Sequence, residues 1–101
     1  MVMFWGINIK DWHVTYDDIS FLDTNFDPVT QQDYLKEDML QLEKKDQNLL
    51  IDVSWRPSFD PDGRFIIVLI KNQNWDKPAS LTETRSIHKT KETITRIIEN
   101  I

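Results

Sequence analysis

The stretch that most constrains the fold is Asn48–Lys71, in which two strand patterns are separated by a turn. Four apolar residues alternate with other residues and so fall on one face of a strand: Leu49, Ile51, Val53 and Trp55. The run 65–70, Phe-Ile-Ile-Val-Leu-Ile, is apolar at every position and predicts a strand that is covered on both faces. Between them, Asp60-Pro61-Asp62-Gly63 suits a type I turn with Gly63 in the left-handed conformation. The stretch therefore predicts a β-hairpin.

Further segments can add strands to this hairpin. Residues 39–43 alternate in hydrophobicity and can pair with its first strand, which gives a three-stranded antiparallel meander with 39–43 as an edge open to a second copy. Short strands are expected at 80–85 and at 13–16. Residues 2–9 suit either a short strand or a helical turn.

The C-terminal segment predicts an amphipathic helix. Its isoleucines share one face at helical spacing, with Ser86 or Thr90 as the candidate N-cap: Ile87, Ile94, Ile98 and Ile101. We therefore predict one α+β domain over residues 1–101, in which an antiparallel β-meander of about three to five strands packs against this helix. The parts are an N-terminal segment at 1–38, a sheet at 39–85 and the helix at 86–101.

The charge is distributed unevenly along the chain. Residues 11–38, here called the acidic segment, contain eight aspartates and glutamates against Lys36 alone, a net charge of −7. Binding to phosphate backbones needs lysine and arginine, so this balance disfavours direct contact with nucleic acid and favours a basic protein partner. Aromatic side chains between the acids can supply the desolvated contacts of such an interface. The candidate partner-binding residues are Asp11, Trp12, Tyr16, Asp17, Asp18, Phe21, Asp23, Phe26 and Asp27.

Two tryptophans have open interpretations. Trp12 is either a recognition anchor or a hydrophobic plug that holds the acidic segment against the domain. Trp75, in the polar loop 72–78, either packs back over the sheet or is exposed for binding.

Catalytic and metal-binding patterns are weak. The chain has no cysteine, and its two histidines, His13 and His88, lack the spacing of metal ligands. With only Gly6 and Gly63, it cannot build a glycine-rich phosphate loop. We expect no enzyme activity, no cofactor and no metal. Proton transfer by His13 with a neighbouring aspartate is the catalytic alternative.

The sequence has no basic leader, and its apolar runs are far shorter than the roughly 20 residues of a membrane helix. We therefore expect a soluble cytoplasmic protein without membrane contact.

The hairpin also carries a family resemblance. Residues 52–65, Asp-Val-Ser-Trp-Arg-Pro-Ser-Phe-Asp-Pro-Asp-Gly-Arg-Phe, are followed by an apolar strand, Trp75-Asp-Lys-Pro78 and a terminal helix. Over residues 39–101 this resembles the small bacterial immunity proteins encoded beside contact-dependent growth inhibition and other polymorphic toxins. The resemblance implies tight binding to a toxin's C-terminal domain, often a basic nuclease, and coverage of its active or substrate-binding surface. The alternative is an intracellular regulatory module that binds some other protein. A monomer is favoured.

Overall fold

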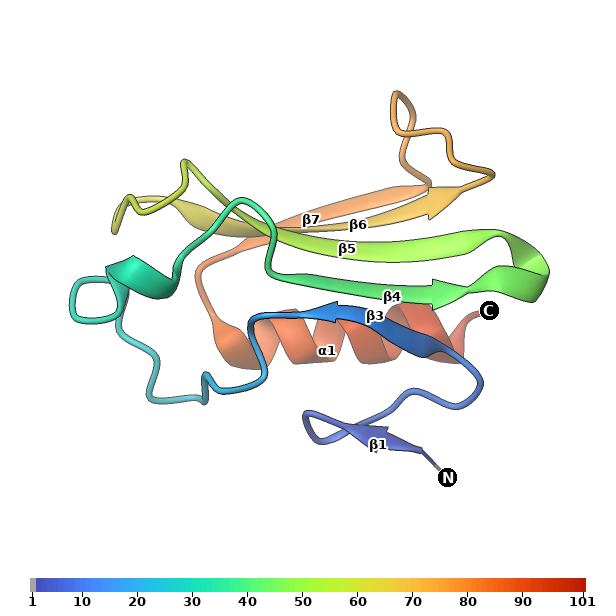
Figure 1. The fold of residues 1–101 in the computed structure, drawn as a ribbon, viewed down its shortest axis with the longest axis horizontal. Coiled ribbons are helices and arrows are strands. Elements are labelled where there is room, and N and C mark those ends of the chain that lie inside the picture. Colours follow the sequence, from blue (N-terminus) through green and yellow to red (C-terminus); the bar gives the residue numbers. More distant parts are fainter. Residues whose placement is uncertain (1) are drawn as a thin grey trace.

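The computed structural model describes residues 2–101, whose elements follow one another as short strands, a five-stranded sheet and a final helix (Figure 1). The strands are β1 (Met3–Phe4), β2 (Ile7–Asn8), β3 (His13–Asp17), β4 (Leu40–Lys44), β5 (Leu49–Arg56), β6 (Arg64–Lys71) and β7 (Ser80–Thr84). The helix is α1 (Ile87–Glu99), and two short 3-10 helices are η1 (Gln32–Tyr34) and η2 (Lys45–Gln47).

The main sheet is antiparallel throughout, in the order β3-β4-β5-β6-β7, and β1 and β2 form a separate hairpin. The predicted α+β class is confirmed. Residues 2–9 adopt the strand alternative. The prediction that 39–43 is an edge was wrong: β3 pairs along the outer side of β4, so the edges of the sheet are β3 and β7.

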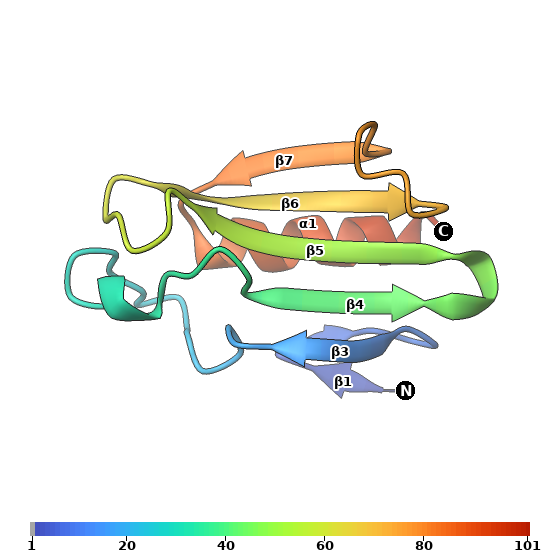
Figure 2. The same cartoon turned by 45° about the horizontal axis from the view of Figure 1, so that its top comes forward.

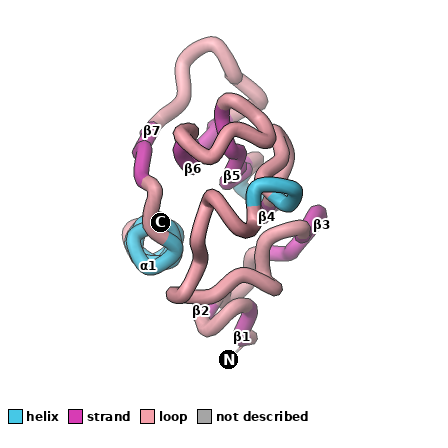
Figure 3. Tube along the Cα trace, turned by 90° about the vertical axis from the view of Figure 1, so that its left-hand side faces the viewer, coloured by secondary structure: helices cyan, strands magenta, loops and turns pink. Residues whose placement is uncertain are grey.

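The core lies between the sheet and a layer made of α1 and the β1–β2 hairpin (Figure 3). Alternate residues of β5 and β6 face this layer, and Trp55 lies opposite Phe65 in the register. Phe26 joins these two rings, with centroids 5.8 and 5.4 Å away. From the helix, Ile87, Ile94 and Ile98 are buried, whereas Ile101 lies beyond the last turn and is exposed. Ser86 is the N-cap, because its side chain accepts a hydrogen bond from the Lys89 backbone amide.

The turn between β5 and β6 forms where it was predicted, but for a different reason. The Gly63 amide donates to the Asp60 carbonyl, as a turn requires. Gly63 itself is not left-handed; the positive φ of this loop belongs to Phe59, at +61°. A Cβ at Gly63 would lie 2.6 Å from both the Arg56 carbonyl oxygen and Trp55 Nε1. Close packing, rather than backbone conformation, therefore requires glycine here.

The opposite side of the sheet is not covered by any helix or strand of residues 2–101 (Figure 2). The expectation that strand 65–70 is covered on both faces was therefore wrong: Ile66 and Val68 are only half-buried, while Ile70 is buried apart from the main core. We call this side the open face. By register and alternation it carries His13, Tyr16, Gln41, Glu43, Leu50, Asp52, Ser54, Arg56, Arg64, Ile66, Val68, Ile70, Leu81 and Glu83.

Across residues 2–101, α1 is too short and too polar to cross a bilayer, and no other helix of that part approaches the required length.

Candidate protein-binding surfaces

Two aromatic residues predicted to contact a partner are part of the interior instead. Trp12 is 2% exposed and belongs to the main core, so the hydrophobic-plug interpretation of this residue is the one the structure supports. Phe26 is half-buried against the Trp55 and Phe65 rings. Together with the buried Ile19, Leu22 and Leu35, these two side chains hold the acidic segment against the domain.

Three aspartates of the acidic segment stabilise its irregular backbone. Asp17 accepts hydrogen bonds from the amides of Ile19 and Ser20, both at 3.0 Å. Asp23 and Asp27 each accept from the amide two residues ahead. Such bonds replace the backbone partners that a helix or strand would supply. The sequence count of negative charges therefore includes groups with a structural role of their own.

Two more aspartates form ion pairs. Asp11 pairs with Lys44, whose side chain is 8% exposed at an inward-facing position of β4, and hydrogen bonding to Lys44 lowers the pKa of Asp11. Asp18 pairs with the half-exposed Lys36. For Asp17, partial burial opposes ionisation, but the hydrogen bonds from Ser20 and Ile19 prevail and lower its pKa. The lowered pKa values of Asp11 and Asp17 favour the charged form of both carboxylates.

Phe21 and Tyr34 form an exposed aromatic pair within the acidic segment, and we call it the aromatic patch. Their ring centroids are 5.1 Å apart in an edge-to-face arrangement, and the residues are 53% and 50% exposed. Asp33 precedes Tyr34 directly and is exposed. Sequence reasoning missed Tyr34, because nothing in the pattern shows that it points outward while its neighbour Leu35 is fully buried. The one signal that could have selected Tyr34 is its position next to Asp33 in the acidic segment.

The open face begins beside this segment. Tyr16, at 40% exposure, lies opposite Gln41 in the register, and its hydroxyl lies 3.5 Å from the Asp18 carboxylate. The face therefore continues from the acidic segment across β4, β5 and β6 to Leu81 on β7.

Two hollows indent the open face. One, of about 510 Å³, is lined by side chains of opposite charge around Ile66: Glu37, Arg56, Pro57, Ser58, Arg64 and Glu83. Within it, Arg56 pairs with Glu37 at 3.1 Å and Arg64 with Glu83 at 3.4 Å. The other, of about 310 Å³, contains Leu50, Ile70 and Trp75. Trp75 is 51% exposed, which is the exposed alternative for this residue.

The histidines and the basic helix have ordinary surroundings. His13 is exposed at the start of β3 and lines a shallow hollow with Asp11, Lys45 and Asp46. Lys89 and Arg96 both pair with Glu92. Residues 2–101 contain no cluster of three or more potential metal-binding side chains.

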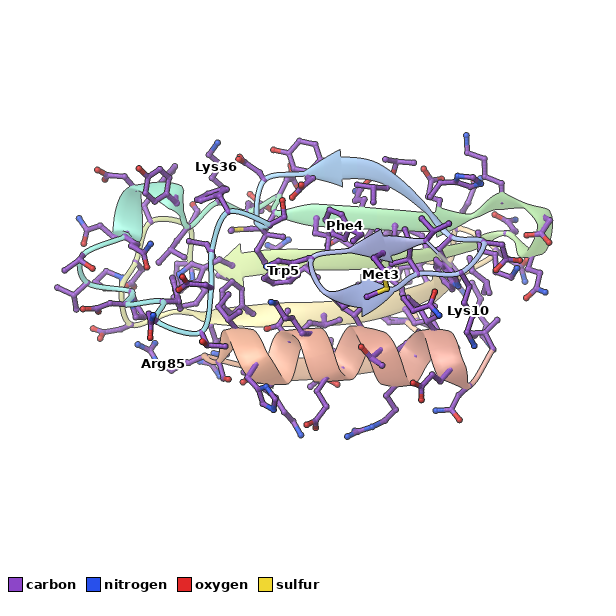
Figure 4. The ribbon with its side chains drawn as sticks, turned by 90° about the horizontal axis from the view of Figure 1, so that it is seen from below. Met3, Phe4, Trp5, Lys10, Lys36 and Arg85 are labelled. Carbon is purple, nitrogen blue, oxygen red and sulfur yellow. The ribbon has the colours of Figure 1, made fainter. Side chains whose placement is uncertain are left out.

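The N-terminal hairpin lies beside α1, with Phe4 and Trp5 beneath the sheet (Figure 4). The Lys91 ammonium lies 4.8 Å from the Trp5 ring, and Trp5 Nε1 donates to the Leu22 carbonyl at 2.9 Å. This side of the molecule is closed by its own contacts, unlike the open face.

Comparisons with protein-family profiles, curated proteins and solved structures gave no match to this chain.

Proposed function

We propose that this chain is an immunity protein, which binds a bacterial toxin domain one to one and blocks its active or substrate-binding surface. The observation that carries the proposal is the aromatic patch, an exposed Phe21–Tyr34 pair inside a segment of net charge −7. Aromatic side chains dominate the strongest contacts of protein interfaces, and here two exposed rings pack against each other.

The charge of the segment defines the chemistry of the partner. A nuclease presents lysine and arginine where it holds nucleic acid, and the acidic segment would pair with those groups while the aromatic patch loses its water. Asp17, Asp23 and Asp27 keep their hydrogen bonds to the backbone and still present negative charge outward. The segment is thus arranged before binding, which lowers the entropy cost of association.

The test is co-expression with the product of the adjacent upstream gene, followed by purification of the pair and a growth assay. A one-to-one complex that restores growth is expected. A complex with a non-toxic neighbour would instead support the regulatory module, and absence of any complex would overturn the proposal.

Variants of the aromatic patch locate the interface. Phe21→Ala with Tyr34→Ala should weaken the complex about 30-fold or more, the range of an interface hot spot. Val29→Ala is the control, because Val29 is an exposed apolar residue of the same segment at 69% exposure. If the double variant and the Val29→Ala control bound with equal affinity, the aromatic patch would not be part of the interface.

A further inference from the structure

Asp52 is an unusual residue for its place on the open face. It lies in the middle of β5, the central strand, opposite Gln41 on one side and Val68 on the other. It is 9% exposed. Aspartate is depleted in strands, and a carboxylate removed from water normally needs a cation nearby.

Among residues 2–101, the cation that acts on this carboxylate is Arg56, and it does so without an ion-pair contact. Within residues 2–101 no lysine, arginine or histidine forms an ion pair with Asp52. Its carboxylate accepts one hydrogen bond, from Gln41 Nε2 at 3.0 Å. Burial raises the pKa of Asp52, and the nearby Asp38 carboxylate adds to the rise, although Gln41 and Arg56 act against it. Arg56 is itself paired with Glu37.

Apart from Gln41 and Ser54, the neighbours of this carboxylate on the open face are apolar. Leu50 lies two residues before it on the same face, Val68 lies directly across, and Leu81 follows on β7 at 57% exposure. Leu50 also lines the hollow beneath Trp75. A buried acid beside half-buried Leu50 and Val68 and exposed Leu81 matches a lysine or arginine whose aliphatic stem can cover the same apolar surface.

We propose that the open face binds the basic surface of the toxin domain, with a lysine or arginine of that domain paired with Asp52 inside the apolar surround. The inference rests on the proposed function and extends its interface from the acidic segment across the sheet. Tyr16 connects the two regions, because it lies on the open face and its hydroxyl approaches Asp18.

A second copy of the chain fits this face less well than a basic partner. In a symmetric dimer each residue near the two-fold axis meets itself. Asp52 occupies the central strand, so a two-fold axis at that strand would place two buried carboxylates against each other. The two arginines of the face, Arg56 and Arg64, are already paired with Glu37 and Glu83. Like charges brought together in an interface oppose association.

The experiment measures the affinity of Asp52→Asn for the purified upstream gene product by titration calorimetry. Asparagine keeps the shape and can still accept from Gln41, so only the charge is lost. We expect a loss of about 30-fold or more, the effect of removing one member of a desolvated charge pair. Leu81→Ser tests the apolar surround and should weaken binding about fivefold or more. Glu99→Gln, which removes one charge from exposed α1, should leave affinity unchanged.

The outcomes separate the two proposals. If the wild-type protein binds and Asp52→Asn binds equally well, this inference is overturned while the proposed function stands. If Asp52→Asn instead produces a dimer of this chain and keeps full affinity, the face belongs to self-association and the inference is also overturned. If the wild-type protein binds nothing, the proposed function and this inference are both overturned.

Discussion

Gly63 lies against the backbone of the strand that precedes it, and this contact gives a direct test of the hairpin turn. A Cβ there would collide with the Arg56 carbonyl and with the indole of Trp55, whose Nε1 donates to the Asp60 carbonyl at 2.8 Å. We expect Gly63→Ala to lower the free energy of unfolding by about 1–3 kcal/mol, the usual cost of overpacking. Urea unfolding measures it.

Two controls separate packing from other effects at Gly63. Ser58→Ala, in the same loop and exposed, should change stability by less than about 0.5 kcal/mol. Gly6 has open space around its missing Cβ but a φ of +76°, so Gly6→Ala should cost about 1 kcal/mol through backbone strain alone. If Gly63→Ala were as stable as Ser58→Ala, the close approach of Gly63 to the Arg56 carbonyl and the Trp55 indole would be contradicted.

Asp52 should reduce stability at neutral pH, which is testable without any partner. Its pKa in the folded state is raised above the value of 3.8 for the free side chain, because burial and the Asp38 charge disfavour ionisation. Between these two pKa values the folded state holds more protons than the unfolded state, so stability falls as pH rises through that window. Asp52→Asn should therefore be more stable than wild type at pH 7, and the gain should disappear below about pH 3.8.

The comparison needs urea unfolding of both proteins at each pH, since other carboxylates also titrate in acid. Asp38→Asn is the matched control: it removes a repulsive neighbour and should give a smaller gain in the same direction. If Asp52→Asn were less stable at pH 7, the added strength that the negative charge gives to the hydrogen bond from Gln41 would outweigh the cost of burying the carboxylate. The charge would then stabilise the fold.

At the scale of elements, α1 depends on its first turn. Ser86 accepts from the Lys89 amide at 3.0 Å and satisfies one of the free amides at the helix start. Ser86→Ala should lower the free energy of unfolding by about 1 kcal/mol. Thermal or urea unfolding detects this change. Ser80→Ala, at an exposed position of β7, should have almost no effect, and an equal loss in both variants would contradict the cap.

The elements with strong periodic patterns were predictable, and those held by tertiary contacts were not. β5, β6 and α1 follow from alternation and helical spacing and lie within one residue or two of the predicted bounds. The pairing of β3 outside β4 depends on contacts between distant segments, including the Lys44–Asp11 pair, and no local pattern encodes them. Lys44 occupies an inward position that a hydrophobic pattern assigns to an apolar residue.

The position of the candidate site along the chain was predictable, but the role of each of its residues was predictable only in part. The acidic segment does carry exposed Tyr16 and Phe21, as charge and aromatic content indicated. Trp12 shows the limit: sequence alone gave both of its roles equally, and only packing against the core separates them. The sequence predicted that strand 65–70 is covered on both faces, and this was wrong. An apolar run of this kind looks the same whether its second face is covered by the chain itself or left for a partner.

For the whole molecule, the open face lies opposite α1 and the N-terminal hairpin, and the acidic segment reaches this face through Tyr16 (Figure 1). The chain carries net −8 over residues 1–62 and +3 over 63–101, and two of the helix cations are paired with Glu92. The negative charge thus belongs mainly to residues 1–62, which include the acidic segment, β4 and β5. Such a field attracts a basic domain before contact and orients it during approach.

The association rate with the toxin domain should therefore depend strongly on salt. Raising ionic strength from 0.01 to 1 M shortens the screening length from about 30 to about 3 Å, so we expect the association rate constant to fall at least about tenfold. Dissociation should change little, because the contacts that hold the complex are desolvated. Stopped-flow tryptophan fluorescence measures both rates. Phe21→Ala with Tyr34→Ala should show the reverse pattern, with faster dissociation and unchanged salt dependence of association. An association rate constant independent of salt would mean that the negative charge of the acidic segment does not act on the approaching partner, and this prediction would be wrong.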